Sequence, residues 1–133
     1  MKTESFSMSA VIPGEPREVF DSWLSSKGHS AMTQSPARAS ARVGGAFTAW
    51  DGYITGKNLE LEPGKRIVQS WRTTEFPADA PDSRVEIRLE PATTGTRLIL
   101  KHTLIPAGQG GGYRQGWRDY YFVPMKRFFG RKS

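Results

Sequence analysis

Two histidines, His29 and His102, are the main candidates for acid–base or metal chemistry, and the chain contains no cysteine. The absence of cysteine excludes a disulfide, a thiolate nucleophile and a thiolate metal site. Two histidines this far apart in the sequence form no recognisable metal-binding motif. We therefore predict neither a metal nor a cofactor.

His102 is the candidate acid or base. It alternates with polar residues in the same segment as Leu98 and Leu100, which places it on the dry face of a strand. A neutral imidazole there can relay a proton or hold an oxygen atom of a ligand. A histidine on a dry face is more often a core residue whose ring nitrogens bond to neighbours. We predict no catalytic residue, and an enzyme that uses His102 stays as an alternative.

The other polar candidates have structural explanations. His29 is expected in a polar region that follows the first helix. Asp51 lies at an expected hairpin tip and is typical of a turn former, and Asp119 is expected as a solvated residue of the last helix. No carboxylate is thus placed to orient His102.

The composition favours one folded core. Of the 133 residues, 37% are hydrophobic and 24% are charged, which is typical of neither a disordered chain nor a membrane protein. No apolar run approaches the roughly 18 residues of a membrane span, and the N-terminus lacks the apolar region of a signal peptide. We expect one domain over residues 1–133 and a cytoplasmic location.

The net charge of +6 and the pI of about 9.9 raise the question of a nucleic-acid partner. Most basic residues are spread along the chain, many of them beside Glu or Asp. The densest group lies at the C-terminal end and comprises Lys126, Arg127, Arg131 and Lys132. Because no nucleic-acid-binding motif accompanies this charge, the pattern argues against nucleic acid as the partner.

The first quarter of the chain predicts a strand followed by a helix. Apolar residues alternate with polar ones before Pro13-Gly14, which is the period of a half-buried strand. Pro16 suits the first turn of a helix that runs to about residue 25, and residues 27–33 add a turn or two. Residues 35–41 indicate a connection or an irregular edge strand. The apolar residues of the first strand are Phe6, Met8, Ala10 and Ile12.

Five more strands are expected, separated by residues that turns require. Asp51-Gly52 indicates a tight hairpin, because both positions can take positive φ, and Pro63-Gly64 indicates the next turn. The expected strands are residues 45–50, 52–62, 65–75, 83–90 and 96–105.

A long C-terminal helix is predicted over residues 111–129, after a glycine-rich loop at 106–112. Pro124 inside this helix is expected to bend or break it near Val123. The loop is a candidate lid, for which we expect amide exchange in residues 107–112 to slow when a ligand binds. The aromatic stripe of the helix contains Tyr113, Trp117, Tyr120, Tyr121 and Phe128.

This aromatic stripe must lie against an apolar surface, and the dry faces of the strands supply one. In the strand from residue 65, Ile67 and Trp71 bring Gln69 to the same covered side as His102. The pattern predicts an α+β fold in which a curved antiparallel sheet wraps around the long C-terminal helix.

The sequence also resembles a known family, the homologues of the activator of heat-shock protein 90 ATPase in the START-like, helix-grip superfamily. The resemblance covers residues 11–128. It implies a β-α-α-β6-α order and a cavity for a lipid-like or aromatic ligand. The activators that name the family carry a further N-terminal domain, for which a chain of this length has no room. The motifs that carry the resemblance are Gly44-Gly45-Ala46-Phe47, Asp51-Gly52-Tyr53-Ile54-Thr55-Gly56, Leu59 to Ile67, Trp71, Gly95-Thr96, His102 and Gly116-Trp117.

A largely apolar cavity on the covered side is the predicted binding site; the alternative is that the same side chains fill the core. The first hypothesis is a non-enzymatic domain that binds a small apolar or aromatic ligand. The second is a module that contacts a chaperone, and the third is an enzyme for an aromatic or polyketide-like substrate. The predicted ligand-binding residues are Phe6, Met8, Phe47, Ile67, Gln69, Trp71, Leu98, Leu100, His102, Trp117, Tyr120 and Tyr121.

Overall fold

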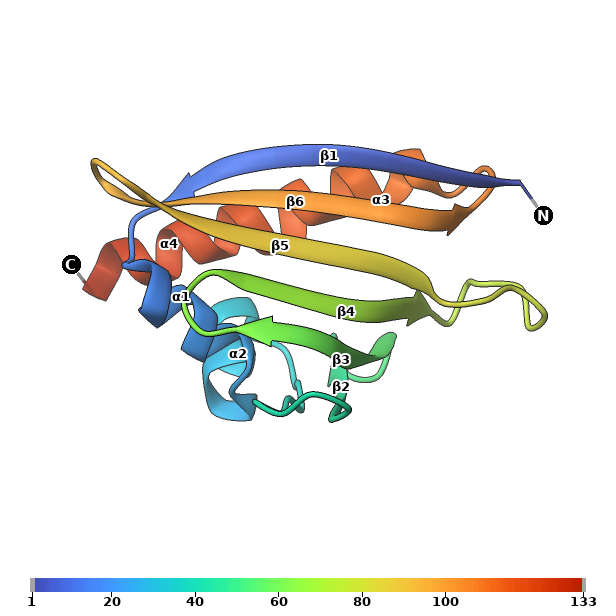
Figure 1. Cartoon of the computed structure of the whole chain (residues 1–133), viewed down its shortest axis with the longest axis horizontal. Coiled ribbons are helices and arrows are strands. Elements are labelled where there is room, and N and C mark those ends of the chain that lie inside the picture. The colour runs from blue at the N-terminus through green and yellow to red at the C-terminus, as the bar shows by residue number, and fades with distance from the viewer. Residues whose placement is uncertain (1, 133) are drawn as a thin grey trace.

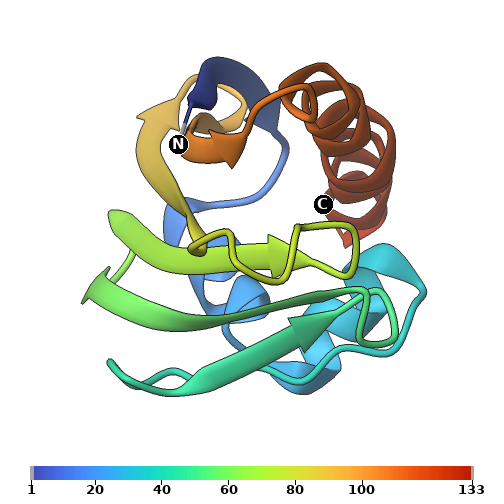
Figure 2. The same ribbon diagram turned by 90° about the vertical axis from the view of Figure 1, so that its right-hand side faces the viewer.

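A six-stranded antiparallel sheet runs in the order β1-β6-β5-β4-β3-β2 in the computed structural model. The structure describes residues 2–132, with side chains described for residues 2–130. The sheet curves along one side of the C-terminal helix, as the two views in Figures 1 and 2 show. The strands are β1 (Thr3–Ile12), β2 (Ala46–Ala49), β3 (Ile54–Glu62), β4 (Arg66–Thr73), β5 (Ser83–Ala92) and β6 (Gly95–Pro106). This arrangement confirms the predicted fold class.

Two short helices connect β1 to β2. Helix α1 (Pro16–Trp23) begins with a capping box in which the Glu18 carboxylate accepts the backbone N–H of Glu15 at 3.2 Å. Helix α2 (Ser26–Thr33) begins where the Ser25 hydroxyl accepts the N–H of Gly28. The connection that follows makes a single bridge between Arg38 and Thr48, as an irregular edge strand would.

The C-terminal helix is continuous, so of the two effects expected near Val123, a bend or a break, the break is wrong. It consists of α3 (Gly110–Trp117), a π-helical stretch η1 (Arg118–Phe122) and α4 (Val123–Lys132). The N–H of Val123 bonds to the carbonyl of Arg118, five residues earlier. Pro124 has no N–H and its ring crowds the carbonyl four residues before it. A widened π turn just before Pro124 accommodates both effects and keeps the helix running.

A bulge in β6 corrects the expected placement of Leu104. Glu4 pairs with Ile105 but Phe6 pairs with His102, so β6 has one residue more than β1 in this stretch. Leu104 takes a left-handed φ of 61° and is 49% exposed, whereas Ile105 is fully buried. The period of two that places Leu100 and His102 on the dry face is therefore interrupted before Leu104.

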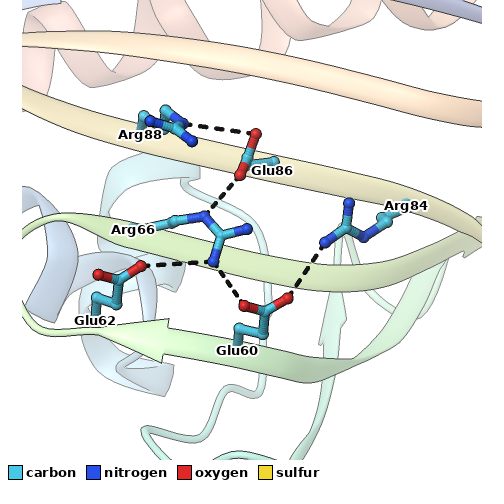
Figure 3. Close-up of polar contacts among 6 residues, drawn as sticks. All are labelled: Glu60, Glu62, Arg66, Arg84, Glu86 and Arg88. Atoms are coloured by element: carbon cyan, nitrogen blue, oxygen red, sulfur yellow. Dashed lines mark hydrogen bonds and ion pairs between the residues drawn. The ribbon is translucent and has the colours of Figure 1, made fainter.

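The outer face of the sheet carries a network of ion pairs (Figure 3). Arg66 pairs with Glu60 at 2.7 Å and with Glu86 at 2.6 Å, and the hydrogen bond from Arg66 holds the pKa of Glu60 below its usual range. Val68 lies between Glu60 and Glu86 in the sheet and is fully buried. The apolar stems of these long side chains shield it from water.

The core lies between the concave face of the sheet and the helices. It contains Ile67, Leu98, Leu100 and Phe129, each no more than 1% exposed. The polar residues expected on the covered side, Gln69 and His102, are also buried. Within the part of the chain that the structure describes, no helix is long and apolar enough to cross a membrane.

Candidate ligand-binding pocket

A pocket of about 760 Å³ lies where α3 and η1 face the β2–β3 hairpin and the end of β4. This volume is within the range of small-molecule sites in proteins. Seven of its thirteen lining residues are aromatic, so its walls suit an apolar or flat ligand. The lining residues are Trp50, Tyr53, Ile54, Trp71, Glu75, Gly108, Gln109, Gly112, Tyr113, Gly116, Trp117, Tyr120 and Tyr121.

Stacked rings form the deep wall of the pocket. Trp117 stacks on Tyr121 at 4.8 Å between ring centroids and on Trp71 at 6.1 Å. The ring of Tyr113 meets Trp71 edge to face at 5.0 Å. Trp71, Trp117 and Tyr121 are each 3–4% exposed, so neighbouring side chains hold their rings in place and only a small part of each ring faces the pocket.

Two glycines leave one face of the helix bare. Gly112 and Gly116 are four residues apart, so they lie on the same face, and both line the pocket. A Cβ atom added to Gly112 would meet no atom within 4 Å, and one added to Gly116 would meet only the Tyr120 ring at 3.9 Å. The space beside this face is therefore open to larger side chains.

The β2–β3 hairpin delivers Trp50 to the pocket. Ala49 pairs with Ile54, so the loop has four residues instead of the two expected from Asp51-Gly52. Trp50, Asp51 and Gly52 all have positive φ, which is uncommon for a bulky residue such as tryptophan. The N–H of Asp51 bonds to the carbonyl of Pro36 at 2.9 Å and helps to fix this conformation.

The mouth of the pocket is polar. The hydroxyl of Tyr53 donates to the carboxylate of Glu75, and the hydroxyl of Tyr113 donates to Gln109 Oε1 at 2.7 Å. Thr73 Oγ1 lies 2.5 Å from the same Tyr113 oxygen. Burial, followed by the hydrogen bond to Glu75, raises the pKa of Tyr53, and burial also raises the pKa of Tyr113. Both phenols therefore stay protonated and can act as donors or acceptors at neutral pH.

The glycine-rich loop is tied down at this mouth. The carboxylate of Glu4 accepts the N–H of Gly110 at 2.8 Å, which satisfies one free donor at the start of α3. Hydrogen bonds from Gly108 and Gly110 hold the pKa of Glu4 below its usual range. Gln109 Nε2 also donates to the Glu75 carbonyl at 3.0 Å. The loop is thus bonded to β1 and to the turn that follows β4, and its role as a lid stays a prediction.

His102 lies behind the pocket wall in an ordered chain of hydrogen bonds. Trp117 Nε1–H donates to His102 Nδ1 at 3.2 Å, and His102 Nε2 lies 2.8 Å from Ser83 Oγ. The Ser83 hydroxyl donates to the Trp71 carbonyl, so it must accept from Nε2–H. Burial lowers the pKa of His102 to about 3. Both ring nitrogens are occupied and the ring is neutral, which argues against the enzyme that uses His102.

His29 is buried, which corrects its expected place in a polar region. The Ser25 cap extends the chain into α2 and carries His29 inward, where it is 3% exposed. Its Nδ1 donates to the Trp23 carbonyl at 2.9 Å, and its Nε2 accepts the Tyr121 hydroxyl at 2.8 Å. Burial lowers the pKa of His29. This histidine therefore supports Tyr121, a residue of the pocket wall, from behind.

Gln69 joins three elements in the core instead of reaching the pocket. Its Oε1 accepts Trp23 Nε1–H at 3.2 Å, and its Nε2 donates to Asn58 Oδ1 at 2.9 Å. Asn58 in turn donates to the carbonyls of Ser40 and Arg42. This network fixes the long connection between α2 and β2.

The structure thus divides the predicted binding residues into those that line the pocket and those that lie in the core. Four predicted residues, Trp71, Trp117, Tyr120 and Tyr121, line the pocket. Phe47, Ile67, Leu98 and Leu100 are buried in the core, and the partly buried Phe6 and Met8 pack against it. Whether any of them binds a ligand stays a prediction.

The predicted binding residues did not include Trp50, Tyr53, Glu75 and Gln109, which line the pocket. These residues belong to turns or strand ends, where alternation with a period of two does not indicate which way a side chain points. The one available signal was a tryptophan directly before Asp51-Gly52.

The sequence of this chain is similar to those of known proteins. A family model described as "Activator of Hsp90 ATPase homolog 1-like protein" matches residues 14–130. The activator of 90 kDa heat shock protein ATPase homolog 1 of Homo sapiens is 31% identical over 115 residues, which are 86% of this chain and 34% of that protein. The chain therefore spans about a third of the length of this protein and of its counterpart from Mus musculus.

Solved structures agree on the fold. An HSP90 activator from Plasmodium falciparum superposes with a TM-score of 0.83 at 23% identity, covering 95% of this chain and 96% of that one. A protein from Mesorhizobium loti gives a TM-score of 0.82 at 21% identity, covering 98% and 99%. The architecture is the helix-grip fold, and the family match shows that this chain belongs to the Activator of Hsp90 ATPase homolog 1-like proteins.

Proposed function

We propose that this domain binds a small, largely apolar or aromatic molecule in the pocket between the C-terminal helix and the β3–β4 end of the sheet. Most of the lining residues are aromatic, and Tyr113 and Gln109 offer hydrogen bonds at the mouth. A mostly apolar pocket with a few placed polar groups is the usual form of a small-molecule site.

The observation that carries the proposal is the bare helix face at Gly112 and Gly116. Glycine within a helix costs about 1 kcal/mol relative to alanine, because the unfolded chain loses more freedom. Neither position needs glycine for packing, since an added Cβ would meet open space or an ordinary contact. Two glycines on the face that lines the pocket preserve volume at the expense of helix stability.

Filling this volume tests the proposal. The neutral fluorescent probe N-phenylnaphthylamine is titrated into the wild-type chain and into Gly112→Leu and Gly116→Leu variants. We expect saturable binding to the wild type and a loss of at least about tenfold in affinity in both variants, because leucine occupies the probe's space. Gly111→Leu is the matched control, since Gly111 also has open space around it but does not line the pocket.

Circular dichroism checks that the variants fold. Leucine favours helix more than glycine does, so the variants should be at least as stable as the wild type. Equal probe affinity in the wild type and in both pocket variants would show that the probe binds elsewhere and would remove the support for this site.

A chaperone-associated role is the second candidate. Its support is the 31% identity with the human activator, which covers 86% of this chain. The test mixes the purified chain with purified heat-shock protein 90, measures complex formation by analytical ultracentrifugation and follows the chaperone's ATPase rate. A complex would support this role. If no complex forms and the ATPase rate does not change, the result would count against it.

A further inference from the structure

The pocket has an unusual charge for this chain. Nineteen residues are Lys or Arg and the net charge is +6, yet among the side chains that the structure describes none that lines the pocket is basic. Glu75 is the single charged side chain in that lining. Glu75 is exposed at the mouth, so the charge at the entrance of the pocket has the opposite sign from the chain as a whole.

The charge of Glu75 is not neutralised by a neighbour. Within residues 2–130, no lysine or arginine forms an ion pair with it. Arg72, the nearest basic residue along the chain, pairs instead with Asp82 at 2.7 Å and lies over the Phe76 ring. The carboxylate accepts a hydrogen bond from Tyr53, which leaves further acceptor capacity on its two oxygens. An unpaired carboxylate beside a pocket attracts a positively charged group.

The aromatic walls favour the same sign of charge. The faces of tryptophan and tyrosine rings carry negative electrostatic potential and attract cations within about 6 Å. Trp50 and Tyr113 are half-buried and Tyr120 is 60% exposed, so these are the lining rings that a ligand can reach. Trp71 and Trp117 are only 3–4% exposed and lie behind them. Ring faces and a carboxylate together form the setting in which proteins hold ammonium groups.

We propose that the ligand of this pocket is an organic cation, with its positively charged nitrogen near Glu75 and its flat or apolar body against Trp50 and Tyr120. This inference rests on the proposed function and adds the charge class of the ligand. An anionic ligand would place its charge against both the carboxylate and the ring faces, so fatty acids and organic phosphates are disfavoured.

Three probes with the same aromatic body and different charge test the proposal. They are naphthylmethyl-trimethylammonium, naphthylmethanol and naphthylacetate, each titrated into the full chain by isothermal calorimetry at low ionic strength. The quaternary nitrogen keeps its charge at every pH and cannot donate a hydrogen bond. We expect the cation to bind at least about tenfold more tightly than the alcohol and the anion to bind most weakly.

The Glu75→Gln variant isolates the carboxylate. It retains the size of the side chain and an oxygen that accepts from Tyr53, so it should fold as the wild type does. We expect it to reduce cation affinity about tenfold and to change the affinity of the alcohol much less. Asp79→Asn is the matched control, because Asp79 is an exposed acid of the neighbouring loop that does not line the pocket.

The outcomes separate this inference from the proposed function. Binding of the cation that weakens in Glu75→Gln but not in Asp79→Asn supports the inference. Equal affinity for all three probes, or equal loss in both variants, overturns it while leaving an apolar-ligand site in place. No binding of any probe contradicts the proposed function and this inference with it.

Discussion

Mild acid should destabilise this protein through His102. The folded state keeps His102 neutral, with its pKa lowered by burial to about 3 from an ordinary value of 6.5. The unfolded chain binds a proton near pH 6.5, so stability falls as the pH drops below that value and levels off near pH 3. Between the two pKa values, each pH unit changes the free energy of unfolding by about 1.4 kcal/mol. The free energy of unfolding should therefore fall by about 2 kcal/mol between pH 7 and pH 5.

Carboxylates contribute little to the change in stability between pH 7 and pH 5. Glu4, Glu60 and Glu86 have lowered pKa values in the folded state, so their stabilisation is present above pH 4.5 and is lost only below it. His29 acts in the same direction as His102, because burial also lowers its pKa. The wild-type loss between pH 7 and pH 5 should therefore exceed the share of His102 alone.

The His102→Gln variant measures how much of the pH-dependent loss of stability is due to His102. Its amide can donate to Ser83, but it has no proton equilibrium in this range, so its stability should change by about 2 kcal/mol less between the two pH values. Urea unfolding followed by tryptophan fluorescence at pH 7, 6 and 5 measures the difference. Equal pH dependence in the wild type and in His102→Gln would refute the assignment of His102 as a buried neutral residue.

Three further predictions concern the fold and the loop. Leu104→Gly should leave the free energy of unfolding unchanged or raise it by up to about 1 kcal/mol in denaturant titration, because glycine relieves a left-handed φ at an exposed site; a clear loss of stability would contradict this. Glu4→Gln should speed amide exchange in residues 108–112, because the anionic acceptor for Gly110 is lost, and unchanged exchange would mean that this contact does not hold the loop. Asn58→Ala should cost about 2–4 kcal/mol, since it leaves two carbonyls and the Gln69 amide without partners; a cost below 1 kcal/mol would argue against this network.

The fold could be predicted from the sequence because its signals are regular. Alternation in residues 83–105 and turn residues such as Pro63-Gly64 define the strands, and the aromatic stripe defines the helix that covers them. The exceptions arise where a single residue changes the register. The bulge at Leu104 and the π turn before Pro124 leave no mark in a periodic pattern, because each is set by tertiary pairing and crowding.

The site was less accessible than the fold. A pattern of alternation identifies which residues face inward, but it does not distinguish a residue that fills the core, such as Leu100, from one that borders a pocket, such as Trp71. That distinction depends on where side chains are missing, and here on Gly112 and Gly116 of the helix. The polar mouth depends on Glu75 and Tyr53, which come together only when β3 and β4 pair.

The indole N–H signals of the four tryptophans test the pocket most directly. Trp50, Trp71 and Trp117 line it, whereas Trp23 lies behind it and donates to Gln69. In a proton–nitrogen correlation spectrum titrated with N-phenylnaphthylamine, we expect three indole signals to shift and saturate together while that of Trp23 moves least. Four unchanged indole signals, or a Trp23 signal that shifts as far as the others, would contradict ligand binding at this site.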